Sequence, residues 1–119
     1  MSKKRIIPAH SHLVRRDLFQ YHEAEGEIAA EGESYIRHGV RWIGKVWVKN
    51  AFRRAGLGRG LMHAMVEEFH QVPLWLQVHA YDGQIMPDDK LVQWYTGFGF
   101  CATGAPGILM RPAGPLTLE

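Results

Sequence analysis

The sequence predicts a mixed α/β domain, and three stretches of the chain carry this prediction. Residues 40–48 are rich in β-branched and aromatic side chains, which is typical of a strand. Residues 57–70 repeat apolar side chains at helical spacing, and residues 73–80 alternate like another strand. Strand, helix and strand in this order predict a βαβ unit, whose two strands run parallel with a right-handed crossover.

Both faces of the strand at 40–48 are expected to be covered. If its side chains alternate strictly, four apolar residues share one face: Val40, Trp42, Val46 and Val48. Ile43 and Trp47 then lie on the opposite face. A strand that is apolar on both sides is typical of a sheet with layers packed on each face.

The start of the chain fits more than one structure. Residues 13–22 fit a helix with Leu13, Leu18 and Tyr21 inward, and they fit a strand equally well. Residues 27–31 are typical of a short strand. Residues 32–39 either continue that strand or turn.

The end of the chain is expected to add a second helix and a closing pair of strands. After a loop at 81–86, an acidic start that includes Asp88 suits the positive end of a helix. This helix is expected to stop at 97–99, where glycine allows a positive φ. Residues 100–102 and 107–111 then form an antiparallel pair across a turn that contains glycine and proline.

Length and composition predict one domain over residues 1–119. Hydrophobic residues make up 46% of the sequence and charged residues 22%, which is the range of globular proteins. The single cysteine, Cys101, cannot form an internal disulfide, and no apolar run reaches the roughly 20 residues of a membrane helix. We therefore expect a cytoplasmic protein that does not enter a membrane.

The densest positive charge lies in a glycine-rich segment between the predicted strand and helix. Arg53, Arg54 and Arg59 stand there, in a chain whose net charge is only +2. The first amides of a helix have no internal partner and favour phosphate, and glycine lets a ligand approach the backbone. The segment predicts a site for a small anion. A nucleic acid, which needs a broader basic face, is an unlikely partner. From the residues alone, a glycine-rich turn with exposed arginines is the alternative.

Two motifs resemble the GCN5-related N-acetyltransferase (GNAT) superfamily. That family's acetyl-CoA loop reads Q/R-x-x-G-x-G/A after a strand ending in V-x-V, and Arg53, Gly56 and Gly58 fill this pattern. The family's second motif reads N-x-x-A-x-x-L/F-Y-x-x-x-G-F. Its register is matched, with Asp for Asn and Leu for Ala, by Asp88, Leu91, Trp94, Tyr95, Gly99 and Phe100. The resemblance covers residues 40–111 as a cofactor-binding core and leaves 1–39 as a shortened N-terminal part of strands and helix.

The resemblance implies a mostly antiparallel mixed sheet, flanked by helices, whose central parallel pair at 40–48 and 74–80 splays apart to hold acetyl-CoA. Acetyl-CoA is then a co-substrate, and no metal is implied. The cofactor-binding residues that it implies are Val46, Trp47, Val48, Arg53, Arg54, Ala55, Gly56, Leu57, Gly58, Arg59 and Asp88. Tyr95 is expected near the thioester sulfur, which it protonates as the sulfur leaves.

The implied activity is an N-acetyltransferase that passes the acetyl group directly to an amine on a small molecule, peptide or protein. The family usually has two helices between its first two strands, and these helices help to wall the acceptor site. Because only residues 1–39 precede the main strand here, at least one helix is expected to be trimmed. A homodimer could complete the pocket.

No acid stands where some family members keep a catalytic glutamate, because Trp42 occupies that position. His79 is the expected general base, with Glu33 and His38 as more distant candidates. The missing acid keeps an alternative open, a non-catalytic module on the same fold that binds acyl-CoA or another protein. The spacing of the seven histidines matches no metal motif, so no metal site is expected.

Overall fold

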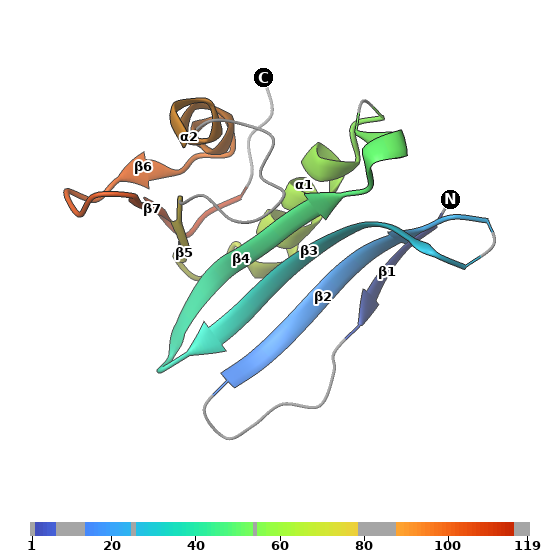
Figure 1. Ribbon diagram of the computed structural model, residues 1–119. Coiled ribbons are helices and arrows are strands. Elements are labelled where there is room, and N and C mark those ends of the chain that lie inside the picture. The colour runs from blue at the N-terminus through green and yellow to red at the C-terminus, as the bar shows by residue number, and fades with distance from the viewer. Residues whose placement is uncertain (1, 7–13, 25, 54, 79–87, 116–119) are drawn as a thin grey trace.

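The computed structural model describes residues 2–6, 14–24, 26–53, 55–78 and 88–115. Within these residues, seven strands form one sheet in the spatial order β1-β2-β3-β4-β5-β7-β6 (Figure 1). The elements are β1 (Ser2–Ile6), β2 (Val14–His22), β3 (Ile28–Arg37), β4 (Val40–Val48), η1 (Asn50–Phe52), α1 (Leu57–Phe69), β5 (Leu74–Gln77), α2 (Asp88–Thr96), β6 (Cys101–Ala102) and β7 (Ile108–Arg111). All strand pairs are antiparallel except β4 with β5, so the predicted mixed sheet with a central parallel pair is confirmed.

The N-terminal part of the described chain is built from strands. β2 pairs with β3 along its whole length, so the residues that fitted either a helix or a strand form a strand. β3 continues to Arg37 and meets β4 at a tight turn, where His38 and Gly39 have φ of 52° and 79°. Positive φ at both turn residues matches the right-handed twist of the two strands, which explains the tight hairpin.

No helix precedes β4 in the part of the chain that the structure describes. β1 and β2 are antiparallel neighbours, and only residues 7–13, which lie outside the described residues, separate them. The sheet therefore begins with four strands in simple meander order.

A β-bulge in β4 changes which side chains share a face. Ser34 of β3 pairs with Ile43, whereas Gly32 pairs with Val46, so β4 carries one extra residue between these pairs. A Cβ on Gly32 would lie 2.8 Å from the Cε of Met65 in α1, so Gly32 and its partner Val46 face α1. The expectation that Trp42 shares a face with Val46 and Val48 is therefore wrong.

The main core lies between the sheet and α1, which runs behind β3 and β4 in Figure 1. The predicted apolar stripe of this helix is confirmed, since each member is at most 9% exposed: Leu61, Met62, Met65, Val66 and Phe69. α2 adds Leu91, Trp94 and Tyr95 at the border of the core, and Phe98 and Phe100 follow it into the interior. α2 ends where predicted, before Gly99 with φ of 96°.

A buried ion pair crosses the sheet beneath the end of α1. Arg41 Nη1 donates to Asp17 Oδ2 at 3.0 Å and to Ser34 Oγ at 2.9 Å. The Arg41 guanidinium also lies 3.7 Å from the ring centre of Phe69, a cation–π contact. Asp17 and Ser34 are fully buried and Arg41 is 8% exposed, so this cluster is part of the interior.

A second buried arginine fastens the end of the described chain. Arg111 donates through Nε to the carbonyl of Phe98 at 2.7 Å, and through its terminal nitrogens to the carbonyls of Pro112, Gly114 and Pro115. Burial lowers the pKa of Arg111 below its usual value. The four carbonyl partners satisfy the guanidinium in an interior that would otherwise disfavour it.

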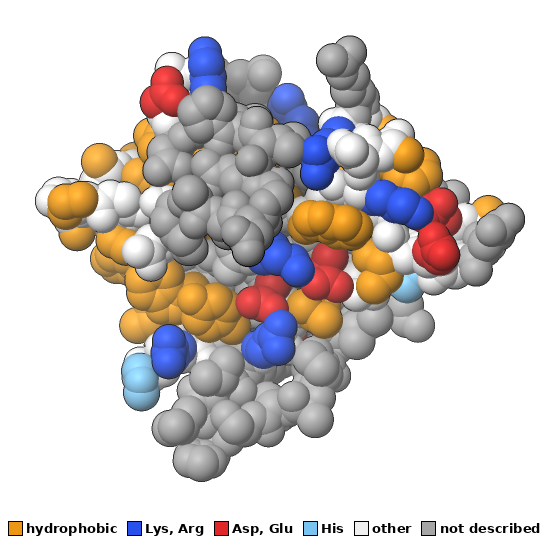
Figure 2. Space-filling view, in the orientation of Figure 1, with side chains coloured by type: hydrophobic (Ala, Val, Ile, Leu, Met, Phe, Trp, Pro, Cys, Tyr) orange, Lys and Arg blue, Asp and Glu red, His pale blue; other side chains and the backbone are white. Residues whose placement is uncertain are grey.

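The opposite face of β2, β3 and β4 is covered by no helix of the described residues. Figure 2 shows acidic side chains at the centre of this face, between basic ones, with apolar side chains on both sides. Trp42 lies here against Trp75, with ring centres 6.2 Å apart. We call this surface the open face.

No helix in the described ranges is long and apolar enough to span a membrane.

Candidate functional site

A cleft opens where β4 and β5 separate. The two parallel strands pair only through Trp42 with Trp75 and Ile43 with Leu76, after which β4 runs on to Val48. β5 stops at Gln77, and the next amide bonds to the carbonyl of Gly107 near β7 instead of returning to β4. The resulting cleft has a volume of about 650 Å³ and is lined by residues of β3, β4, β5 and α2. We call it the β4–β5 cleft.

The cleft reaches both faces of the sheet. On the side of α1 it is lined by Val46, Val78 and Tyr95, and on the open face by Glu33 and Trp42. The bulge in β4 contributes to this geometry, because it turns Val46 toward α1 while Gly44 stays on the open face.

The first turn of α1 leaves its amides available to a ligand. Gly56 is the N-cap with φ of 77°, and no side chain among the described residues caps the helix start. The first intrahelical bond at this end is from the Gly60 amide to the Gly56 carbonyl at 3.0 Å, so the amides before Gly60 precede the helical ladder. These amides and the helix dipole make this end favourable for an anion.

Glycine is required around this turn for packing as well as for backbone shape. A Cβ on Gly60 would collide with the hydroxyl of Tyr21, and a Cβ on Gly58 would lie 3.6 Å from Val48 and 3.8 Å from Trp94. Gly58 therefore lies between β4 and α2, and α2 packs close to the start of α1. The close approach of Tyr21 gives a reason for glycine at position 60, whereas the neighbours of Gly58 lie at ordinary contact distance.

The arginines predicted at this site differ in position. Arg53 donates through Nε to the carbonyl of Val48 at 3.1 Å, so its side chain holds the turn after β4. Arg59 is exposed on the first turn of α1. Arg54 lies outside the described residues. The clustered arginines of the sequence thus include one that positions the loop itself.

The remaining sequence-predicted residues fall into three groups. Val46 lines the cleft, whereas the side chain of Trp47 points to the open face, where its strand partner is Glu31. Ala55 is exposed and Leu57 is buried beside it at the start of α1. Asp88 begins α2, but its side chain is not among those described, and His79 lies outside the described residues.

Tyr95 stands on α2 at the wall of the cleft. Its ring packs edge-on against Trp94 at 5.2 Å and against Phe100 at 6.1 Å between ring centres. It is half-buried and lines the cleft on the side of α1. The aromatic contacts restrict the ring, so the direction of its hydroxyl is set by α2.

Glu33 is the carboxylate that the described residues place in the cleft. Arg16 of β2 donates to its Oε2 through both Nε, at 3.0 Å, and Nη2. The other oxygen, Oε1, points over Gly44, because a Cβ on that glycine would lie 2.8 Å from it. The pairing with Glu33 raises the pKa of the Arg16 guanidinium above its usual value. From the sequence alone Glu33 is a more distant candidate base than His79. Its position in the cleft depends on the pairing of β3 with β4, which the sequence does not show.

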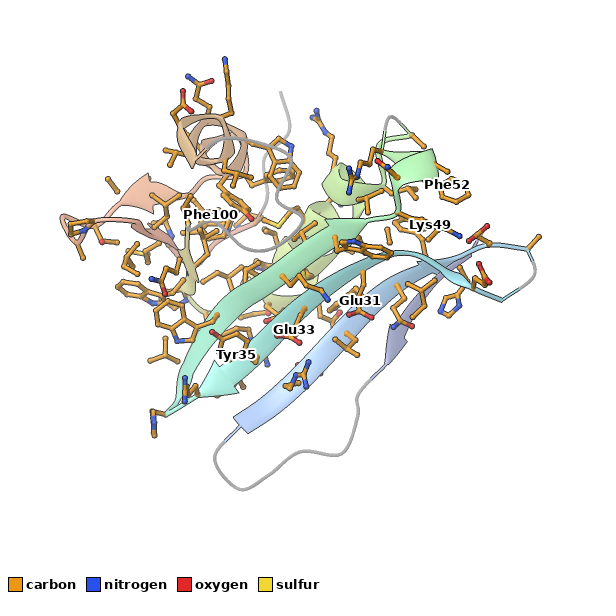
Figure 3. All side chains as sticks on the ribbon, viewed as in Figure 1. Glu31, Glu33, Tyr35, Lys49, Phe52 and Phe100 are labelled. Carbon is orange, nitrogen blue, oxygen red and sulfur yellow. The ribbon has the colours of Figure 1, made fainter. Side chains whose placement is uncertain are left out.

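A second acid on β3, Glu31, has different partners. It accepts from Gln20 Nε2 at 2.7 Å, and Lys45 Nζ lies 3.8 Å from its Oε1. Figure 3 shows Glu31, Glu33 and Tyr35 following one another along β3. Glu31 does not line the cleft. Among the described residues, no three His, Cys, Asp or Glu side chains form a group that could hold a metal ion.

Comparison with known proteins gives one family. A model of the acetyltransferase (GNAT) family matches residues 4–100. An acetyltransferase structure from Bacillus cereus is 16% identical, with a TM-score of 0.60 over 83% of this chain and 74% of that one. A GNAT-family acetyltransferase from Staphylococcus aureus is 14% identical, with a TM-score of 0.57 over 83% and 68% of the two chains.

A structure of AtaTR bound with acetyl-CoA is 11% identical, with a TM-score of 0.58 over 85% of this chain and 68% of that one. No curated protein matches the sequence. At these identities the solved structures show a shared fold, while the family model spans most of the chain. The chain therefore belongs to the GNAT acetyltransferase family.

Proposed function

We propose that the protein is an acetyl-CoA-dependent N-acetyltransferase that passes the acetyl group directly to an amine of a small molecule, peptide or protein. The observation that carries this proposal is the cleft between the separating strands β4 and β5, and the uncapped start of α1 after β4 supports it. Such a cleft fits a cofactor that is long, narrow and phosphorylated at one end.

The residues present fit acetyl-CoA. The backbone of Val46 and Val48 would hold the pantetheine arm, because both residues continue β4 past the last rung shared with β5. The amides at the start of α1 would hold the pyrophosphate, with the exposed Arg59 adding positive charge. When bound, the cofactor supplies a thioester whose carbonyl carbon is open to attack by an amine.

The transfer needs three things from the protein. The acceptor nitrogen must be neutral when it forms the new C–N bond, the carbonyl must be polarised, and the sulfur needs a proton as the C–S bond breaks. Tyr95 supplies that proton from its hydroxyl and is reprotonated when the acceptor nitrogen loses a proton. Because the amine attacks the thioester directly, no nucleophilic side chain of the protein takes part.

The test combines calorimetry with a transfer assay. Acetyl-CoA and CoA are titrated into the protein, and CoA release is then followed with butylamine, spermidine, Nα-acetyl-lysine amide and glycylglycine amide. We expect binding and amine-dependent release, and Tyr95→Phe should lower kcat by about 10²-fold without weakening CoA binding, since only the proton donor is lost.

Each possible result bears on a different part of the proposal. A flat calorimetric trace with both acetyl-CoA and CoA contradicts cofactor binding altogether. Binding without release for any amine favours the alternative, a non-catalytic module that binds acyl-CoA. Full activity of Tyr95→Phe contradicts the role of the tyrosine alone.

A further inference from the structure

The geometry points to Glu33 as the general base, which accepts the proton of a primary alkylammonium acceptor through Oε1 while Arg16 holds Oε2. This inference rests on the proposed N-acetyltransferase function and names the acceptor class and the residue that prepares it. It is carried by the place of Glu33 in the cleft and by the unequal surroundings of its two oxygens.

The two oxygens of Glu33 have different partners. Oε2 receives two hydrogen bonds from Arg16, whose forked guanidinium fixes the plane and direction of the carboxylate. No donor among the described residues bonds to Oε1, which lies over Gly44 at the open-face side of the cleft. A carboxylate with one oxygen anchored and the other directed into a cleft can hold an ammonium group and take its proton.

The bulge in β4 makes room for this arrangement. Gly44 and Lys45 lie opposite Glu33 across the strand pair, so one partner carries no side chain and the carboxylate can lie over it. Tyr35 also approaches this glycine, at 3.1 Å from a would-be Cβ. Any other residue at position 44 would push both side chains away from the cleft.

The charged groups around Glu33 come from three strands. β2 contributes Arg16, β3 contributes Glu31 and Tyr35, and β4 contributes Lys45, which is directed to Glu31 at 3.8 Å. Arg16 is anchored to Glu33 through two hydrogen bonds, and Glu31 is held by its own partners.

The proton balance is simple. The ammonium gives one proton to Oε1 of Glu33, and the neutral nitrogen forms the C–N bond with the acetyl carbon as the C–S bond breaks. The sulfur takes its proton from Tyr95, which is reprotonated when the new amide nitrogen loses its second proton. Glu33 then releases its proton to water, so one proton leaves for each acetyl group transferred.

Alkyl amines need such a base at neutral pH. A primary alkyl amine has a pKa of about 10, so roughly one molecule in a thousand is neutral at pH 7. A positioned base that removes the proton is worth about 10²–10⁴-fold in rate. The register of β3 and β4 places Glu33 in the cleft.

The experiment compares Glu33→Gln with Glu31→Gln as its matched control, using the four amines named above. Both changes remove one acid of β3 on the same face, but only Glu33 lines the cleft. For Glu33→Gln we expect kcat/KM at pH 7 to fall by about 10²-fold or more. With butylamine and Nα-acetyl-lysine amide, its kcat/KM should then rise about tenfold for each pH unit up to about pH 10, as the free amine increases.

Binding measurements separate this role from a structural one. Glu33→Gln should bind CoA as the unchanged protein does, and should bind Nα-acetyl-lysine amide about tenfold more weakly in calorimetry, because the ammonium loses its carboxylate. Glu31→Gln should keep the unchanged protein's rate, pH profile and affinities. A loss in Glu33→Gln that is equal at every pH, or no loss, overturns the assignment of Glu33 and leaves the proposed function standing. If the unchanged protein acetylates none of the four amines, both proposals fail.

Discussion

Two arginine–carboxylate pairs link strands on opposite faces of the same sheet. On the face of α1, Arg41 and Asp17 are 7% and 0% exposed, and the guanidinium also bonds to Ser34 and packs on Phe69. On the open face, Arg16 and Glu33 are 53% and 18% exposed, and one carboxylate oxygen faces the cleft. The same chemical pair therefore occurs in two very different environments.

The difference in exposure gives the two pairs different roles, one in stability and one in the geometry of the cleft. A buried pair is strongly destabilised when one partner is removed, because the remaining charge is left without compensation in the interior. An exposed pair contributes little to folding, since water competes for both partners. The pair on the open face therefore adds little to stability, and its geometry matters through the direction that it gives to Glu33.

The largest expected effect is on stability at the buried pair. Arg41→Met keeps much of the volume but removes the arginine partner of the buried Asp17, so the free energy of unfolding should fall by about 3–5 kcal/mol. Arg16→Met, the matched change on the open face, should alter it by less than about 1 kcal/mol. Urea unfolding followed by tryptophan fluorescence measures both values. Equal losses in the two variants would show that burial does not distinguish the pairs.

A smaller effect is expected on activity when Arg16 is removed. Arg16→Ala frees the Glu33 carboxylate to rotate, so kcat/KM for the acceptor amine should fall by about tenfold while acetyl-CoA affinity stays the same. In a protein that already carries Glu33→Gln, Arg16→Ala should cause no further loss, because the arginine acts through the carboxylate. Independent, additive losses in this double-mutant cycle would contradict a positioning role.

Local patterns of the sequence predicted the elements on either side of the glycine-rich loop before α1. The apolar repeat of α1, the glycines at its start and the stop of α2 before Gly99 all depend on residues close together in the chain. These features are confirmed with nearly the expected bounds. The role of each residue in the loop was less accessible, since Arg53 holds the carbonyl of Val48 through a contact that the motif does not encode.

Features that depend on strand register could not be predicted. One extra residue in β4 reverses the alternation after Ile43, and nothing in a single strand marks where its partner strand skips a position. In the sequence, nothing marks Arg41 as a buried residue. The pairing of β2, β3 and β4 brings Asp17 and Ser34 to its guanidinium. Glu33 ranked behind His79 as a candidate base because its place in the cleft depends on this register.

The smallest expected effects come from two glycines that lie near each other at the bulge but face opposite sides. A Cβ on Gly32 would lie 2.8 Å from Met65 Cε and 3.4 Å from Leu61 Cβ, within the core. Gly32→Ala should therefore lower the free energy of unfolding by about 1–3 kcal/mol through overpacking. Its folded form should keep full activity, since nothing in the cleft moves.

Gly44→Ala should give the converse result. Its Cβ would meet Glu33 Oε1 at 2.8 Å and Tyr35 at 3.1 Å, and a carboxylate end at the surface can move aside with little cost in stability. The displaced oxygen no longer points into the cleft, so kcat/KM should fall by about three- to tenfold. Thermal unfolding and initial rates, measured on both variants, separate the two faces. If Gly44→Ala loses stability and keeps its rate, then Gly44 serves packing, and the direction of Glu33 over it has no part in the reaction.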